Sequence, residues 1–145
     1  MALSPMMQHY LQTKEKLKDC IVFYRLGDFY EMFFDDAIKA SSLLDLTLTG
    51  RDCGLEERAP MCGIPFHAAD MYISKLVSLG EKVAICEQLT QPGGKELVKR
   101  DVIKIVTAGT VTNNELIDDK SNNFLASVYI KNNKFAISWV DITTG

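Results

Sequence analysis

The chain has 145 residues, of which 47% are hydrophobic and 24% charged, and its formal net charge is −3. This balance is typical of a folded globular protein and excludes a disordered one, and the length suits one domain or one domain with part of a second. No apolar run reaches the roughly 18 residues of a membrane span, and the N-terminus lacks the basic start and apolar stretch of a secretion signal. We therefore expect a cytoplasmic protein with no membrane partner.

The negative charge bears on nucleic-acid binding, because phosphate contacts normally demand a basic surface. A DNA-binding module of this charge would bind weakly if isolated and would need a clamp elsewhere to hold the duplex. The four cysteines contain no C-x-x-C pair, and disulfides are not expected in the cytoplasm. A zinc site made of Cys53, Cys62 and His67 would match no familiar ligand spacing, so no metal is predicted.

The first third of the chain predicts a helix and two strands. Ser4-Pro5 is a good helix start, and apolar residues near helical spacing extend the helix over 5–18. Residues 20–26 are rich in β-branched and aromatic side chains and predict a strand. After a Gly27-Asp28 turn, an extended segment is expected to resume over 29–33.

A second helix is expected next, capped by Asp35-Asp36. Its apolar face would contain Ala37, Ala40, Leu43 and Leu44. The alternation over 46–49 predicts a half-buried strand. Residues 50–66 carry three glycines and two prolines and predict a long irregular loop, and loops of that length are usually functional or disordered.

The remaining elements alternate in type. They are a helix over 68–79 with Tyr72, Leu76 and Leu79 on one face and Gly80 as its C′ residue, a strand over 82–89, a polar connector over 91–99, a strand over 102–111 that is central at its start, and a hairpin of 124–130 and 135–142 joined by 131–134.

Alternating strands and helices predict the α/β class, with a mixed sheet flanked by helices, over residues 1–115. Residues 112–123 are polar, and 116–123 are expected to form a linker. The hairpin in 124–145 is then the truncated start of another domain.

The most informative stretch is FYRLGDFYEMFFDDA, residues 23–37. In an extended segment Phe29 and Glu31 project to one face, about 7 Å apart, and Tyr30 projects to the other. The pattern alone favours an amphipathic strand with Phe29 in the core and Glu31 at its edge, because aromatic residues in strands usually serve packing.

This stretch resembles the signature of the mismatch-recognition domain of the MutS family, whose Phe-X-Glu motif stands intact as Phe29-Tyr30-Glu31. The resemblance continues in family order through SPMMQHYL (4–11), APMCGIPFHAADMYISKLVSLGEKVAICEQ (59–88) and RDVIKIVTAGTVT (100–112). The hairpin over 124–142, together with the closing WVDITTG (139–145), resembles the start of the family's connector domain.

The resemblance implies a domain that reads DNA mismatches and is not itself an enzyme. Phe29 would enter a kinked duplex from the minor groove, and Glu31 would contact the mispaired base. It also implies a full-length protein with an ATPase outside this chain that uses ATP and magnesium, a homodimer, downstream factors of the MutL type, and a bacterial, nucleoid-associated location. The partner is double-stranded DNA with mismatches or small loops, and no cofactor is implied for this segment.

Other residues are candidates for supporting contacts. Arg25, Arg51 and Arg58 are candidate phosphate ligands, and Met61, Pro65 and His67 could line the minor groove, although packing or plain exposure explains each equally well. Two rival functions remain. One is a metal-dependent nuclease that uses Asp28, Glu31, Asp35 or Asp36, and the other is a protein-interaction domain that does not read DNA.

Overall fold

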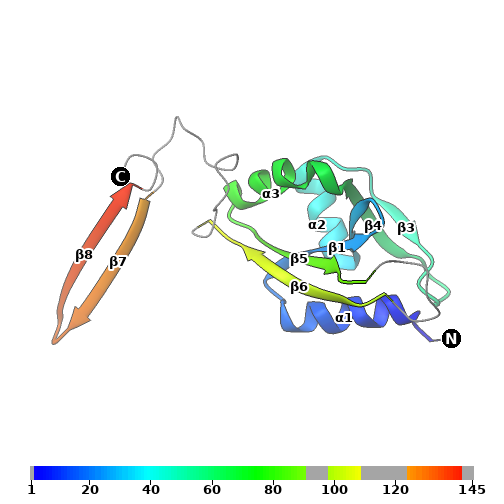
Figure 1. Cartoon of the computed structure of the whole chain (residues 1–145), viewed down its shortest axis with the longest axis horizontal. Helices are drawn as coiled ribbons and strands as arrows, with labels where there is room; N and C mark the ends of the chain where they lie inside the picture. Colours follow the sequence, from blue (N-terminus) through cyan, green and yellow to red (C-terminus); the bar gives the residue numbers. More distant parts are fainter. Residues whose placement is uncertain (1, 91–97, 109–123, 142–145) are drawn as a thin grey trace. The chain divides into compact units, whose positions relative to one another are not determined.

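The computed structural model describes residues 2–90, 98–108 and 124–141, and Figure 1 shows its ribbon. The chain divides into two compact units, Met1–Ala108 and Gly109–Gly145. The predicted boundary at residue 115 and the predicted linker over 116–123 lie outside the described residues. Within those residues, no helix has both the length and the apolar character needed to cross a membrane.

Unit 1 is built from helices and strands in alternation. In chain order the elements are α1 (Pro5–Lys16), β1 (Cys20–Leu26), β2 (Phe29–Phe33), α2 (Phe34–Leu44), β3 (Thr49–Arg51), β4 (Ala59–Pro65), the 3-10 turn η1 (Phe66–Ala68), α3 (Ala69–Ser78), β5 (Lys82–Gln88) and β6 (Arg100–Val106).

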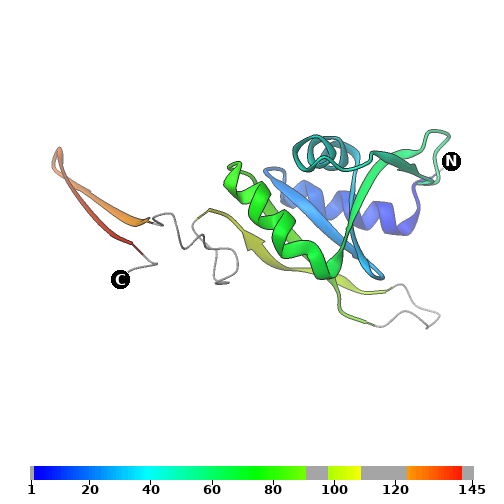
Figure 2. The ribbon, with the colours of Figure 1, turned by 90° about the horizontal axis from the view of Figure 1, so that it is seen from above.

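The six strands form one mixed sheet in the order β3-β4-β2-β1-β5-β6. β1 and β5 are parallel, whereas the other neighbours are antiparallel. Helix α1 lies on one face of this sheet, and α2 and α3 lie on the other (Figures 1 and 2). The predicted α/β class with a mixed sheet between helices is therefore confirmed.

Side chains that alternate along the strands fill both sides of the sheet. On the α1 side, Met7 and Tyr10 pack against Val22, Tyr24 and Phe33, and all five are almost completely buried. Aromatic rings dominate this layer, since Tyr10 meets both Tyr24 and Phe33 edge to face. Edge-to-face contact is a favourable geometry for aromatic pairs, and these contacts hold α1 on the sheet.

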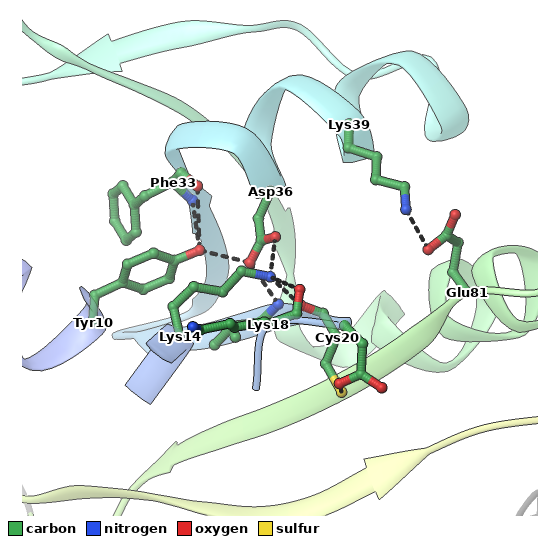
Figure 3. Close-up of polar contacts among 10 residues, drawn as sticks. Tyr10, Lys14, Lys18, Cys20, Phe33, Asp36, Lys39 and Glu81 are labelled. Carbon is green, nitrogen blue, oxygen red and sulfur yellow. Dashed lines mark hydrogen bonds and ion pairs between the residues drawn. The ribbon is translucent and has the colours of Figure 1, made fainter. Parts of the chain in front are cut away.

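A buried carboxylate links the layers (Figure 3). Asp36 Oδ2 accepts hydrogen bonds from the Tyr10 hydroxyl at 2.8 Å and from the Val22 N–H at 3.0 Å, and Lys14 Nζ lies 2.8 Å from Oδ1. Only 4% of Asp36 is exposed. Burial, and next the charge of Asp36, raise the pKa of Tyr10 far above its ordinary value, so this phenol stays a donor.

The predicted cap at Asp35-Asp36 is wrong. Helix α2 begins at Phe34, and its N-cap residue Phe33 makes no side-chain capping bond. Asp36 points instead into the core, and Asp35 is exposed in the first turn, where its charge suits the helix dipole. Phe34 has φ 52°, a strained value for a bulky residue, at the point where β2 turns into α2.

The predicted strand over 46–49 and the predicted loop over 50–66 are also wrong. Strand β3 begins at Thr49, and β4 occupies 59–65 inside the expected loop. The glycines and prolines misled the prediction, because Pro60 lies next to the short edge strand β3 and Gly63 lies where a side chain would crowd Glu31. The irregular part is only 52–58.

Smaller differences concern exposure and order. The strand expected over 102–111 is β6, which lies at the sheet edge and not at its centre, and residues 109–111 are outside the described residues. Leu79 is 53% exposed, so it does not belong to the core face predicted for its helix, whereas Leu43 and Tyr72 are half-buried. The connector expected over 91–99 is described only at 98–99.

Several predictions are confirmed. Gly80 follows α3 with φ 85°, the left-handed conformation of a C′ glycine, and its N–H bonds the carbonyl of Val77. In unit 2, β7 (Phe124–Lys131) and β8 (Lys134–Asp141) form the expected hairpin. Its turn residues Asn132 and Asn133 both have positive φ, as a two-residue hairpin turn requires.

We predict that Asp36→Ala lowers the free energy of unfolding by about 3 kcal/mol, because it leaves a buried hydroxyl, a buried N–H and a lysine without their acceptor. Chemical denaturation measures the change. Asp19→Ala is the control, since it removes an exposed ion pair with Lys82 and should leave the midpoint unchanged. Equal midpoints for both variants would show that Asp36 does not hold the layers together.

Candidate nucleic-acid interface

Strand β2 changes from buried to open along one face. Phe33 lies under α1 and is fully buried, Glu31 is partly buried, and the ring of Phe29 is 46% exposed. Phe29 is held between Leu26 of β1 and Pro65 of β4 in the strand register. A large apolar side chain is thus fixed at the open end of an internal strand, and the reading of Phe29 as a core residue is wrong.

Glu31 lies on the same face, opposite Gly63 of β4. A Cβ built at Gly63 would lie 3.3 Å from Glu31 Cγ and 3.8 Å from Phe29 Cδ1, so the absent side chain leaves room for both. Arg51 of β3 donates from Nη1 to Glu31 Oε2 at 2.8 Å. The carboxylate is therefore paired within the protein.

The structure gathers part of the predicted site on this face. Because residues directly opposite in an antiparallel register share a face, this face includes Phe29, Glu31, Arg51, Met61, Gly63 and Pro65. We call this set the motif face. Met61 and Pro65 are half-buried, and Met61 packs against the core under α1.

Arg25 lies on the other face of the sheet, beside Tyr30. Its guanidinium stacks 3.8 Å from the centre of the Phe66 ring and lies 3.5 Å from Glu87 Oε1. The Tyr30 hydroxyl also donates to Glu87. Burial, followed by this bond to Glu87, raises the pKa of Tyr30 to about 12. Arg25 thus stiffens the strand end that carries Phe29.

Two predicted residues stand apart from the motif face. Arg58 is exposed just before β4, and its side chain lies beside Gly50. His67 is exposed in η1 and contacts the ring of Phe66. Both lie on the surface at opposite ends of β4.

Sequence reasoning missed Gly63 and Phe66. Phe66 is 43% exposed and its N–H bonds the carbonyl of Asp28, so it belongs to the same end of the sheet as Phe29. The signal for Gly63 was its spacing from Pro65, which places both residues on one face once β4 is recognised as a strand. Reading 50–66 as a loop hid that signal.

The residues proposed for metal chemistry do not converge. Asp36 is bound to Lys14, Tyr10 and Val22, and Glu31 is bound to Arg51. Across residues 2–90, 98–108 and 124–141, no group of three His, Cys, Asp or Glu side chains could hold a metal ion.

The cysteines also have separate surroundings. Cys53 belongs to the core under α1, whereas the Cys62 thiol donates to the carbonyl of Ala37 in α2, on the other side of the sheet. All four cysteines are buried and reduced, and burial raises the pKa of the Cys62 and Cys86 thiols to about 11. They act as small apolar core residues.

Comparison with known proteins identifies this class of domain. Residues 4–115 match the model of the family described as MutS domain I. Relatives named DNA mismatch repair protein MutS are 64% identical over 145 residues in Acetivibrio thermocellus, 64% over 144 residues in Ruminiclostridium cellulolyticum, and 60% over 146 residues in Clostridium botulinum strain 657.

These alignments cover 99%, 99% and 100% of this chain but only 17%, 16% and 16% of the relatives, so the chain spans about a sixth of their length. The chain belongs to the MutS family, and its unit 1 has the sequence of that family's domain I.

We predict that Gly63→Ala disturbs the motif face without weakening the fold. Alanine in a strand is normally favoured over glycine by about 0.5–1 kcal/mol, but the new methyl group must push Glu31 aside. A crystal structure should show a longer Glu31–Arg51 separation, while the melting temperature does not fall.

Gly80→Ala provides the opposite control, because Gly80 has φ 85° and open space around it. That variant should lower the melting temperature through backbone strain and leave the Glu31–Arg51 pair intact. An unchanged ion pair in Gly63→Ala would contradict the assigned crowding.

Proposed function

We propose that residues 1–115 of this chain are the mismatch-recognition domain of a DNA mismatch repair protein, and that Phe29 inserts into a mismatched duplex from the minor groove. The observation that carries this proposal is the 46% exposed ring of Phe29 on an internal strand, beside a carboxylate. A phenylalanine ring that is exposed and fixed in this way is available to stack on a base. The relatives' name, DNA mismatch repair protein MutS, supports a damaged duplex as that partner.

Discrimination follows from the deformation energy of the DNA. Inserting an apolar wedge breaks a base stack, which costs a few kcal/mol per step. The cost is lowest where pairing and stacking are already impaired, as they are at a mispair. The Phe29 ring can then stack on the displaced base, a contact that is typically about 1–3 kcal/mol. A sound duplex is thus rejected mainly because it resists kinking.

Glu31 adds a second source of discrimination at the same place, through hydrogen bonding and charge. A carboxylate near phosphates is repelled, and it contributes to binding only where a base donates a hydrogen bond to it. A mispaired base has donors that a matched pair keeps occupied, so the charge favours the mismatch and disfavours a sound duplex.

The supporting contacts come from the neighbouring basic residues. Arg58 is the exposed candidate phosphate ligand, whereas Arg25 is bound to Glu87 on the opposite face and would act by supporting the strand end. Met61 and Pro65 would line the minor groove beside Phe29, and His67 would contact DNA from the surface beyond β4. With a net charge of −3 for the whole chain, tight binding needs a clamp elsewhere in the protein.

For the whole protein we propose the properties that the family resemblance implies. These are a homodimer in a bacterial cytoplasm near the nucleoid, an ATPase elsewhere that uses ATP and magnesium, and downstream factors of the MutL type. The segment itself is proposed to have no catalytic function. Its residues 124–145 would begin the connector domain.

We predict that Phe29→Ala removes most of the preference for a mismatched over a matched duplex, because the wedge is lost. Glu31→Gln should reduce the preference more than it reduces total binding, because matched DNA gains what the charge had opposed. Competition binding of the whole MutS-family protein that carries this domain, with duplexes identical except at one pair, measures both. Met71→Ala, which removes an exposed apolar side chain from α3, is the control.

Each rival function has a distinct outcome in the same assay. Cleavage of the duplex that depends on magnesium would favour the nuclease. Equal affinity of the unmodified protein for both duplexes would favour the protein-interaction domain. If Phe29→Ala kept the full mismatch preference, the proposed wedge would be wrong.

A further inference from the structure

Arg51 contacts the Phe-X-Glu motif from two strands away. It belongs to β3, and β4 lies between β3 and β2 in the sheet, so its side chain must pass across β4 to reach Glu31. There, Arg51 Nη1 lies 2.8 Å from Glu31 Oε2. The arginine side chain is 40% exposed and that of Glu31 only 17%. The ion pair is therefore only partly exposed to solvent, and it lies beside Phe29.

We propose that Arg51 is a positioning residue for mismatch reading, which acts by holding the Glu31 carboxylate in a fixed orientation. This inference rests on the proposed function, because it assigns to Glu31 the contact with a mispaired base. It differs from the role expected for Arg51 from sequence, which was to bind a phosphate directly.

The first argument is orientation. A free glutamate side chain populates many rotamers, and fixing it on binding costs up to about 2 kcal/mol. The bond from Arg51 fixes Oε2 before DNA arrives, so less entropy is lost when a base is contacted. Among the described residues, Oε1 has no hydrogen-bond partner, and it is the oxygen left to accept from a base. Gly63 opposite Glu31 keeps this arrangement free of crowding.

The second argument is charge. The approach of a bare carboxylate to the phosphates of any duplex is opposed by repulsion, and in a partly buried position this repulsion is poorly screened. The guanidinium of Arg51 offsets part of this negative charge. Because the pair is partly exposed, the repulsion is reduced and not abolished, so Glu31 still opposes a matched duplex and offers Oε1 to a mispaired base.

A third argument is the contrast with Arg58. Both arginines flank the segment between β3 and β4, but Arg58 is exposed, and no ion pair to it occurs within the described part of the chain. Arg58 is thus placed as a simple phosphate ligand would be. The guanidinium of Arg51, in contrast, is already bound to the carboxylate of Glu31 in the absence of DNA.

The test is a double-mutant cycle in the whole MutS-family protein, with Arg51→Met, Glu31→Gln and the double variant. We expect Arg51→Met to lower the preference for mismatched DNA by about two- to fivefold, the effect of one partly exposed ion pair. In the Glu31→Gln background, the same change should leave the preference unaltered, because there is no charge left to orient.

Arg51→Lys and Arg58→Met make the result specific. The lysine variant keeps the charge but loses the planar fork, and it should recover part of the preference. Arg58→Met should weaken binding of both duplexes by the same factor and lower the salt dependence by about one phosphate contact. Thermal melting of each variant verifies that the fold is kept, and the lysine variant serves if Arg51→Met does not fold.

Two results would overturn the inference. Equal loss of affinity for both duplexes, with or without Glu31, would make Arg51 a phosphate ligand. A rise in the mismatch preference of Arg51→Met would make the ion pair a restraint that Glu31 must break. Either result leaves the wedge intact if Phe29→Ala still removes the preference, whereas failure of that variant would overturn the proposed function itself.

Discussion

The arrangement of unit 1 depends on the carboxylate of Asp36. This carboxylate belongs to α2, on the opposite side of the sheet from α1. It accepts a hydrogen bond from a hydroxyl of α1 and from a backbone N–H of β1, and it forms an ion pair with an ammonium group of α1. A buried charge is tolerated only when such partners surround it, so the position of each element is constrained by the others. Tyr10 extends the constraint to β2, because the N–H of Phe33 donates to its hydroxyl.

This constraint decides which part of β2 is covered. Helix α1 is held over Phe33, and the open end of the strand is left to Phe29. The two faces of the strand then have different surroundings. On one face Glu31 pairs with Arg51, and on the other Tyr30 bonds Glu87, so neighbouring residues of one strand make separate polar contacts.

Much of this architecture is predictable from sequence, and the failures have physical causes. Strong local patterns predicted α1, β1, β2, α3 and the terminal hairpin, because cap residues, β-branched runs and turn residues agreed with the tertiary structure. The prediction for Asp36 was wrong, because its position in the sequence also suits a helix cap. Only the folded chain brings Tyr10 and Lys14 next to it. Strand β4 was not predicted, because its glycine and prolines are typical of loops. Whether these residues fit a sheet depends on partner strands distant in the chain.

The same division applies to the site. The alternation of β2 predicted that Phe29 and Glu31 share one face, and the regular strand register agrees with it. The pairing of Glu31 with Arg51 was not predictable, because the two residues lie 20 positions apart and meet only through the register of three strands. Gly63 gains its meaning from the same register.

The strand that carries Phe29 is bonded on both sides, to β1 and to β4, and the adjoining turn is tied by the bond from Phe66 N–H to Asp28 at 2.9 Å. The backbone that carries the Phe29 ring is therefore rigid, because a force on the ring is distributed over three strands and the helices packed on them. DNA is far softer at a flexible or damaged step. If Phe29 enters a duplex as proposed, the softer body would change shape, so the duplex would bend while the domain kept its form.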